Sequence, residues 1–188
     1  MSIHTAIMEA MEKGYIWRPQ LTKSAMYKHW LSKEDFRRCL TCARLHGKIW
    51  HIYEEPETKP LIHPNGRCKI VPMGAIVAGT ATMHGQAGAD WVMKQTGDLP
   101  DYYVSQVEAE QAGWRAGKWP SNFIPGKMMG GKRYYNSNGH LPEAAGRIWY
   151  EADINYEMGK RNSYRLLYSN DGLIFVTYDH YETFFEIT

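Results

Sequence analysis

Short hydrophobic runs separated by polar turns dominate the chain from Arg147 to its C-terminus. The runs are rich in aromatic and β-branched residues. Turn sequences such as NYEMGKRN, SNDG and YDHY separate them at intervals of roughly ten residues. This spacing is typical of antiparallel strands joined by tight loops. The C-terminal part of the chain is therefore expected to form a β-sheet.

Two short helical patterns precede these strands. The segment ADWVMKQTGDLP is expected to form a helix that Gly97 and Pro100 stop. In the following segment, SQVEAEQAGW, Ser105 is the expected N-cap and Glu108 stands at the capping-box position. Helices followed by strands predict an α+β domain in which the helices pack on one face of the sheet.

The first part of the chain also carries helical patterns. Residues 6–17 and 21–47 are expected to be mainly helical, with Ser32 as an N-cap because acids follow it. A proline-rich loop follows at 54–68. Glycine and alanine then predict a weakly structured joint. We therefore divide the chain into a mainly helical segment (1–73), a joint (74–88) and an α+β domain (89–188).

Composition and charge limit the classes of protein to which the chain can belong. Hydrophobic residues make up 44% and charged residues 22% of the chain, which is enough apolar material for a sizeable core. The net charge is only +2, with +5 in residues 1–96 and −3 in the rest, so any nucleic-acid contact must come from a local cluster of cations.

No run approaches the roughly 18 apolar residues of a membrane span, and acids stand where a signal peptide would be apolar. We expect neither a membrane partner nor a signal peptide.

The three cysteines lie in the first half of the chain. An odd count that includes a C-x-x-C pair argues against a closed disulfide framework. Cys39, Cys42, His63 and Cys68 offer four ligands for a structural zinc ion that would stabilise a segment with a small core. The alternative is three reduced, partly buried cysteines without metal, and the sequence leaves both readings open.

The predicted strands carry charged side chains on one face. If residues 147–153 form a strand, Glu151 lies on the same face as Trp149 and Asp153. In RNSYRLLYS, Arg161 and Arg165 likewise share a face. The apolar set on the opposite face is expected to pack against the helices: Ile148, Tyr150, Ala152, Tyr164, Leu166 and Tyr168.

These charged residues suit acid–base chemistry on a phosphodiester. A carboxylate such as Glu151 could deprotonate a ribose 2′-hydroxyl while protonated His180 supplies a proton to the departing 5′-oxygen. Arg161 and Arg165 would hold the phosphate oxygens, and no metal would be needed. The alternative is structural: Glu151 and Arg165 form a cross-strand ion pair, and His180 is an ordinary surface residue.

Several stretches resemble barnase and its relatives, the small guanyl-preferring bacterial ribonucleases: LPDYYVSQVEAEQAGW, PGKMMGGKRYY, GHLPEAAGRIWYEADINYEMGKRNSYRLLYS and LIFVTYDHYETF. The resemblance covers about half of the chain, from about residue 97 to 188. It implies the microbial ribonuclease fold, in which short N-terminal helices pack on a five-stranded antiparallel sheet.

The resemblance also implies roles for individual residues. Glu151 matches the family's general base and His180 its general acid. Arg161 and Arg165 match the phosphate-binding arginines, and Tyr181 matches the tyrosine beside the catalytic histidine. The family reaction is a transesterification to a 2′,3′-cyclic phosphate, which is then hydrolysed without a cofactor.

The sequence departs from the family pattern at two positions of one ionic cluster. Gln106 stands where the family has an active-site lysine, and Lys132 stands where the family has an aspartate. We hypothesise a charge swap in which Lys132 supplies the cation that Gln106 cannot. The alternative is that Lys132 points to solvent and that activity is lower.

A third departure lies in the loop that reads the base. The family loop ends in an arginine and a glutamate, whereas here the loop contains Tyr134, Asn136 and Asn138. A neutral Asn138 can hydrogen-bond several bases, so guanine preference is not implied. Tyr134 is expected to stack on a base.

The first half resembles a different family. The stretch from Cys39 to Cys68 (CLTCARLHGKIW…PLIHPNGRC) resembles a motif near the end of phage head-morphogenesis, or minor capsid, proteins. A ribonuclease behind such a segment implies a secreted or delivered toxin that acts in the cytoplasm of a target cell, with a barstar-like inhibitor as a partner. The alternative is a weakly active or inactive RNA- or inhibitor-binding protein of phage origin.

Overall fold

The structure, a computed structural model, describes residues 19–22, 26–33, 35–60, 66–156 and 158–188. The helix expected at 6–17 and the candidate ligand His63 therefore lie outside the described residues. Within the described ranges, every helix is too short or too polar to cross a membrane.

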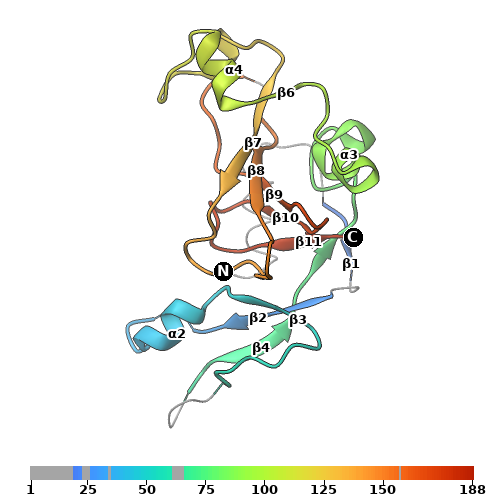
Figure 1. The fold of residues 1–188 in the computed structure, drawn as a ribbon. Helices are drawn as coiled ribbons and strands as arrows, with labels where there is room; N and C mark the ends of the chain where they lie inside the picture. The colour runs from blue at the N-terminus through green and yellow to red at the C-terminus, as the bar shows by residue number, and fades with distance from the viewer. Residues whose placement is uncertain (1–18, 23–25, 34, 61–65, 157) are drawn as a thin grey trace.

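A large twisted sheet forms the centre of the molecule (Figure 1). Its central part is an antiparallel run in which each strand pairs with the next along the chain. These five strands are β7 (Met128–Tyr134), β8 (Trp149–Asp153), β9 (Arg165–Ser169), β10 (Ile174–Thr177) and β11 (Phe185–Ile187). Strands β8 to β11 lie in the region from Arg147 onward where the pattern predicts strands, whereas β7 lies in a stretch that the pattern did not predict as a strand.

The sheet as a whole has eight strands in the described residues, not five, because further strands extend both edges. At one edge β6 (Tyr103–Val104) pairs in parallel with β7. At the other edge β5 (Ala75–Ile76) pairs in parallel with β11, and β1 (Leu21–Thr22) pairs with β5. The segment before the expected domain thus contributes to its sheet.

Two helices lie beside the sheet where the sequence predicts them. Helix α3 (Ala89–Thr96) ends at Gly97, which adopts the left-handed conformation. Helix α4 (Gln106–Gln111) begins at Ser105, whose side chain accepts from the N–H of Glu108 while Glu108 caps it in return. Helix α3 covers one face of the sheet through the first core cluster, which includes Ala89, Met93, Ala152, Leu166 and Val176.

The described residues of the N-terminal segment are mostly strand and loop, not helix as expected for 21–47. Strands β3 (Ile49–His51), β2 (Tyr27–Leu31) and β4 (Lys69–Pro72) form a separate antiparallel sheet in that order, beside the short helix α2 (Leu40–Leu45). Because β2 pairs on both sides, tertiary hydrogen bonding overrides its helical pattern. Ser32 directly follows β2, and its N–H donates to Nδ1 of His46 at 3.1 Å. The described residues after it, 33 and 35–39, form loop, bend and turn and no helix, so the prediction of an N-cap there was wrong. We call residues 26–73 the N-terminal module.

The expected weakly structured joint is also ordered. It contains β5 and the 3₁₀ helix η1 (Gly85–Ala87), and Ala75 and Ile76 are fully buried. The buried carboxylate of Asp90 accepts from the N–H groups of Gly79 and Ala81 and from the hydroxyl of Thr82. A carboxylate at the start of α3 therefore holds this turn in place.

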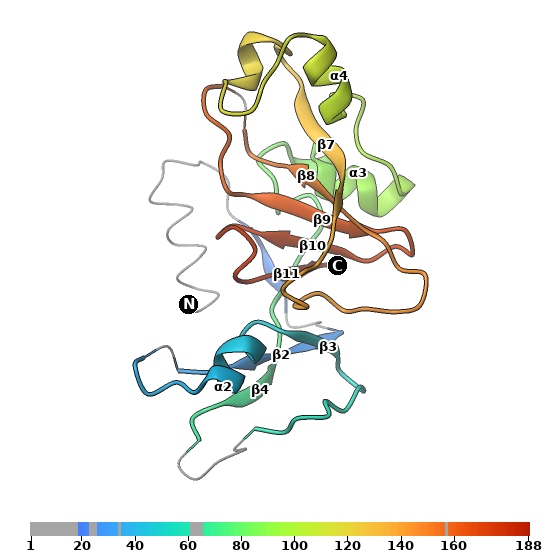
Figure 2. The ribbon, with the colours of Figure 1, turned by 60° about the vertical axis from the view of Figure 1, so that its left-hand side comes forward.

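The N-terminal module packs beneath the large sheet (Figure 2). A second core cluster joins the two parts, and its members are buried residues from both: Tyr27, Ile49, Met73, Leu141, Trp149, Leu167, Phe175 and Phe184. The ring centroids of Tyr27 and Phe175 lie 5.3 Å apart in an edge-on contact. Apolar packing of this kind fixes the module against strands β8, β9 and β10 and the loops beside them.

Candidate active site

Glu151 lies in the middle of β8 and pairs in register with Lys132 on β7. The register shifts between Gly130 and Lys132, and Gly131 adopts a φ of +77°, which describes a β-bulge. At this bulge Nζ of Lys132 lies 3.9 Å from Oε1 of Glu151. The carboxylate is largely enclosed, with 13% of the Glu151 side chain exposed, whereas Lys132 extends toward solvent with 61% exposed.

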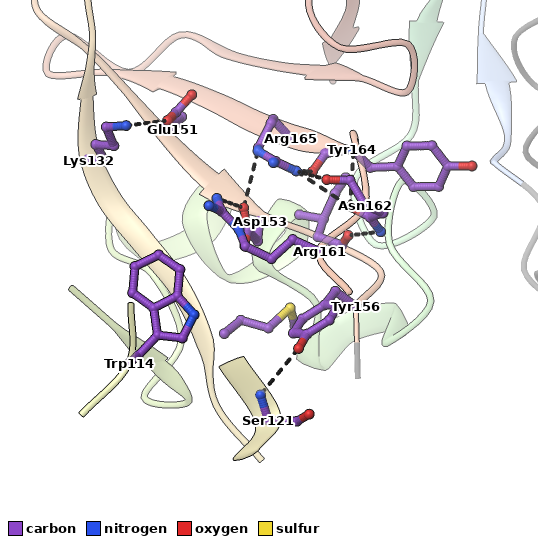
Figure 3. A network of polar contacts seen from close by, with 12 residues as sticks. Trp114, Ser121, Lys132, Glu151, Asp153, Tyr156, Arg161, Asn162, Tyr164 and Arg165 are labelled. Carbon is purple, nitrogen blue, oxygen red and sulfur yellow. Dashed lines mark hydrogen bonds and ion pairs between the residues drawn. The ribbon is translucent and has the colours of Figure 1, made fainter. Parts of the chain in front are cut away.

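Asp153, two residues further along β8, forms ion pairs with both candidate phosphate-binding arginines (Figure 3). Arg161 donates from Nε and Nη2 to the two carboxylate oxygens of Asp153, each at 2.7 Å. Nε of Arg165 lies 3.1 Å from the same carboxylate without hydrogen-bond alignment, so this contact is mainly a charge attraction. Arg165 instead donates from Nη1 to the carbonyls of Asn162 and Tyr164.

The two arginines differ in burial. Arg165, in β9, has 8% of its side chain exposed, whereas Arg161, which precedes that strand, has 34% exposed. Burial acts to lower the pKa of Arg161, but the hydrogen bonds and charge of Asp153 outweigh this effect and raise it. The second Nη of Arg161 is not used by Asp153, so it can donate to an anion.

His180 lies in a tight loop after β10. Both His180 (φ 61°) and Tyr181 (φ 72°) adopt the left-handed conformation that non-glycine residues rarely take. Asp179 holds this loop by accepting from the hydroxyls of Thr177 and Thr183 and from the N–H groups at 182 and 183. The loop is therefore braced in a conformation that exposes the imidazole of His180.

Tyr181 connects this loop to β8. Its hydroxyl donates to Oε2 of Glu151 at 2.5 Å, and its ring centroid lies 4.9 Å from that of His180. Burial and then the Glu151 hydrogen bond raise the pKa of Tyr181 well above its usual range, so the hydroxyl remains a donor. Through this contact the fold brings His180 and Glu151 into one region.

Gln106 reaches the same region from α4. It lines a small pocket with Met129, Gly130, Lys132, Glu151, Asp153 and Arg161. Its Nε2 donates to Glu110 at 2.7 Å. The two positions of the charge-swap hypothesis therefore border the same pocket as the candidate base.

The candidate base-reading loop follows β7. Tyr134 stacks on Tyr181 with ring centroids 5.1 Å apart and an interplanar angle of 19°. Asn138 is exposed, but its oxygen accepts from the N–H of His140 at 3.2 Å and its amide lies 3.1 Å from Nδ1 of His140. Asn136 is buried and uses its side chain within the loop, where it exchanges hydrogen bonds with the backbone of Leu141. The loop thus presents Asn138 and Tyr134 near the site, while Asn136 shapes the loop.

The candidate zinc ligands do not form a metal site in the described residues. Within those ranges, no group of three or more His, Cys, Asp or Glu side chains is arranged to hold a metal ion. Cys68 donates from Sγ to Sγ of Cys42 at 2.9 Å, and Cys39 Sγ accepts from the N–H of Cys42. Burial and these thiol contacts raise the pKa of Cys42 to about 12, so its metal-free form is the thiol. The expectation of a zinc-stabilised segment is not supported.

Three residues near the site were not among those selected from the sequence: Asp153, Asp179 and His140. Asp153 could have been selected, because it lies two positions from Glu151 on the same face of a strand. Asp179 and His140 act through loop contacts that depend on distant elements. No pattern in the sequence signals those contacts.

Comparisons with known proteins concern the same part of the chain. Residues 86–188 match the family model described as ribonuclease, which is more than half of the chain. A ribonuclease from Heyndrickxia coagulans is 50% identical over 90 residues, which cover 47% of this chain and 83% of the relative. Ribonucleases from Bacillus intermedius and Bacillus pumilus are also 50% identical over 90 residues, although this chain spans only 56% of each.

Proposed function

The chain belongs to the ribonuclease family, and we propose on that basis that it is an endoribonuclease that cleaves single-stranded RNA without a metal ion. The observation that carries the proposal is the convergence of Glu151, Tyr181 and the Asp153–arginine cluster at one end of the sheet. Such a site offers a carboxylate, an imidazole and two guanidinium groups to one phosphodiester.

In the proposed reaction, the Glu151 carboxylate removes the proton from the ribose 2′-hydroxyl. The 2′-oxygen then attacks the adjacent phosphorus and forms a 2′,3′-cyclic phosphate, while protonated His180 donates a proton to the departing 5′-oxygen. In the second step the neutral imidazole takes a proton from water, whose oxygen opens the cyclic phosphate, and Glu151 returns a proton to the 2′-oxygen.

The surrounding groups support both roles. The Tyr181 hydroxyl donates to Oε2 of Glu151 and Nζ of Lys132 lies 3.9 Å from Oε1, so the two groups hold the carboxylate in position. Arg161 and Arg165 face the negative charge that develops on the phosphate oxygens. Because Asp153 already holds both guanidinium groups in place, little reorganisation is needed when the substrate binds.

The test is cleavage of a short fluorescent RNA in EDTA by the wild type and by Glu151→Ala and His180→Ala. Each variant should lose on the order of 100-fold or more in rate, as expected for a general acid or base, and the first product should be a cyclic phosphate. Glu57→Ala, which removes an exposed carboxylate from the N-terminal module, should cleave like the wild type. Undiminished cleavage by Glu151→Ala or His180→Ala would refute the assigned roles.

We further propose that the protein is the toxic part of a secreted or delivered toxin and that an acidic barstar-like protein inhibits it. This proposal is supported by the likeness of residues 39–68 to phage head-morphogenesis proteins and by the arginines that an acidic inhibitor could cover. Expression of the wild type should arrest bacterial growth, and His180→Ala should relieve the arrest. Growth arrest that persists in this variant would contradict toxicity through RNA cleavage.

The alternative is a protein that binds RNA or an inhibitor without efficient turnover. Gln106 favours it, because this side chain is neutral and engaged with Glu110 where a cation would serve catalysis. A folded wild type that binds RNA but leaves it intact would support this alternative and identify Gln106 as the first position to change.

A further inference from the structure

The N-terminal module contacts both loops that border the proposed active site. The N–H of Ile49, at the start of β3, donates to the carbonyl of His140 at 2.8 Å. Gly47 fits so closely that a Cβ atom there would lie 2.9 Å from the carbonyl oxygen of Glu182 and 3.3 Å from Nδ1 of His140. Residues 135–141, which we call the base loop, and residues 178–183, the catalytic loop, therefore meet at this edge of the module.

His140 is the half-buried residue at which these three parts join. Its backbone N–H donates to the oxygen of Asn138, and its ring Nδ1 lies 3.1 Å from the amide nitrogen of Asn138. The same amide reaches the carbonyl of Tyr181 at 3.4 Å. His140 thus joins the base loop to the N-terminal module, and through Asn138 it is linked to the catalytic loop.

We propose that His140, held by the N-terminal module, is a positioning residue that fixes Asn138 and the base loop against the catalytic loop and so sets the preference for the base of the RNA substrate. The inference rests on the proposed function, because it assumes that the base loop receives a nucleobase. It assigns a functional role to the N-terminal module, which lies outside the part of the chain that matches the family.

The contact requires a neutral imidazole. The Asn138 amide donates hydrogen bonds, so Nδ1 of His140 must carry a lone pair, and the ring proton is then on Nε2. Protonation would place an N–H group against the Asn138 amide. The charged and titratable groups that face the ring are His46 at the end of α2 and Lys48 just before β3, and neither would stabilise an imidazolium.

The pKa of His140 agrees with this geometry. Burial lowers it first, and the neighbouring His46 and Lys48 lower it further, while the Tyr181 backbone opposes them. Since the pKa of the folded protein lies below the usual value of about 6.5, the neutral form dominates at neutral pH. Protonation, and with it the loss of the Asn138 contact, begins only as the pH falls below that value.

The experiment measures the affinity of the full chain for the four nucleoside 3′-monophosphates by titration calorimetry. Because the phosphate and sugar are common to all four, the ratio of the strongest to the weakest affinity isolates base preference. For His140→Ala this ratio should fall by about 3- to 10-fold, the effect of losing a hydrogen-bonded positioning contact. Base preference of the wild type should decline at acidic pH as His140 is protonated. His140→Gln, whose amide oxygen can still accept from Asn138 and does not titrate, should retain most of the preference without this decline.

The role of the module is tested by a matched pair of glycines. Gly47 and Gly117 have φ values of 84° and 85°, so alanine introduces similar backbone strain at either position. A Cβ at Gly117 meets nothing within 4 Å, whereas at Gly47 it meets the Glu182 carbonyl and His140. Gly47→Ala should reduce base preference, and Gly117→Ala should not. Circular dichroism and the melting temperature establish that each variant is folded.

The outcomes separate this inference from the proposed function. If wild-type binding shows base preference but RNA is not cleaved, the proposed enzyme function fails and the role of His140 is still decided by the variants. If folded His140→Ala and Gly47→Ala keep the wild-type preference, the inference is overturned whether or not RNA is cleaved. A wild type with no base preference overturns it as well.

Discussion

At the scale of single residues, the charge balance around Glu151 and Asp153 decides what the site can do. Asp153 uses its negative charge to hold Arg161 and Arg165, while Glu151 has Lys132 at 3.9 Å and the hydroxyl of Tyr181. The carboxylate that holds the arginines, Asp153, is thus separate from the carboxylate proposed as the general base, Glu151. This division leaves Glu151 to exchange its proton during the reaction.

Lys132 is predicted to supply the cation that Gln106 lacks. Lys132→Ala should lower kcat/KM by about 3- to 10-fold, because a partly exposed charge near a phosphate contributes roughly 1 kcal/mol. The loss should shrink at high salt, where exposed charges are screened. The measurement is RNA cleavage at two salt concentrations.

A control variant and a rescue variant test this prediction further. Lys118→Ala removes an exposed lysine from another part of the surface and should leave the rate unchanged. Restoring a cation at the neighbouring position, in the double variant Lys132→Ala with Gln106→Lys, should recover activity, because both side chains line the same pocket. A Lys132→Ala variant with the wild-type rate would mean that Lys132 only points to solvent.

At the scale of elements, the catalytic loop depends on one carboxylate. Asp179 accepts four hydrogen bonds from within the loop and its ends, and Thr177 in turn accepts from the N–H of Tyr181 at 3.0 Å. These bonds compensate for the two consecutive left-handed residues, His180 and Tyr181. The position of the imidazole therefore comes from the loop rather than from packing of the ring, which is exposed.

Asp179→Ala should release this loop. We expect kcat to fall by about 10-fold or more, because the catalytic imidazole loses its fixed position, and stability to fall by about 2 kcal/mol. Glu182→Ala, in the same loop but with an exposed side chain, is the matched control and should change neither quantity strongly. Cleavage assays and urea unfolding measure the two effects. An unchanged kcat in folded Asp179→Ala would show that the loop keeps its conformation without the hydrogen bonds of Asp179.

At the scale of the whole molecule, the N-terminal module and the large sheet share a core. Tyr27, Ile49 and Met73 from the module are buried with Trp149, Phe175 and other residues of the sheet. Strand β5 also joins the edge of the sheet beside β11. The division at residues 74 and 89 stays a prediction, and the two parts on either side of it are packed together.

Unfolding is expected to be a single transition because of this shared core. Tyr27→Ala, which removes a buried ring 5.3 Å from Phe175, should destabilise the entire chain by about 3–5 kcal/mol. Tyr53→Ala removes a ring that is 83% exposed and should cost little. Urea unfolding followed by tryptophan fluorescence and by circular dichroism should give coincident curves. Two separate transitions, with only one affected by Tyr27→Ala, would indicate independent units.

The sequence by itself determined the features that depend on local pattern. The period of the C-terminal runs predicted the antiparallel strands, and the cap at Ser105 and the stop at Gly97 follow from local backbone chemistry. The apolar face that includes Ala152 and Leu166 packs near α3, as the alternation predicts. The motifs around Glu151 and His180 placed the chain in its family, because those motifs are contiguous along the chain.

The tertiary structure alone decided the features that depend on long-range contacts. Residues 27–31 have a helical pattern, but pairing with β3 and β4 makes them a strand. The joint became ordered because β11 and Asp90 supply its hydrogen-bond partners. His140 and Asp179 owe their positions to loop contacts between residues far apart in the sequence, which exist only in the folded molecule. Local propensity is worth a few tenths of a kcal/mol per residue, so burial and pairing across the molecule override it wherever they compete.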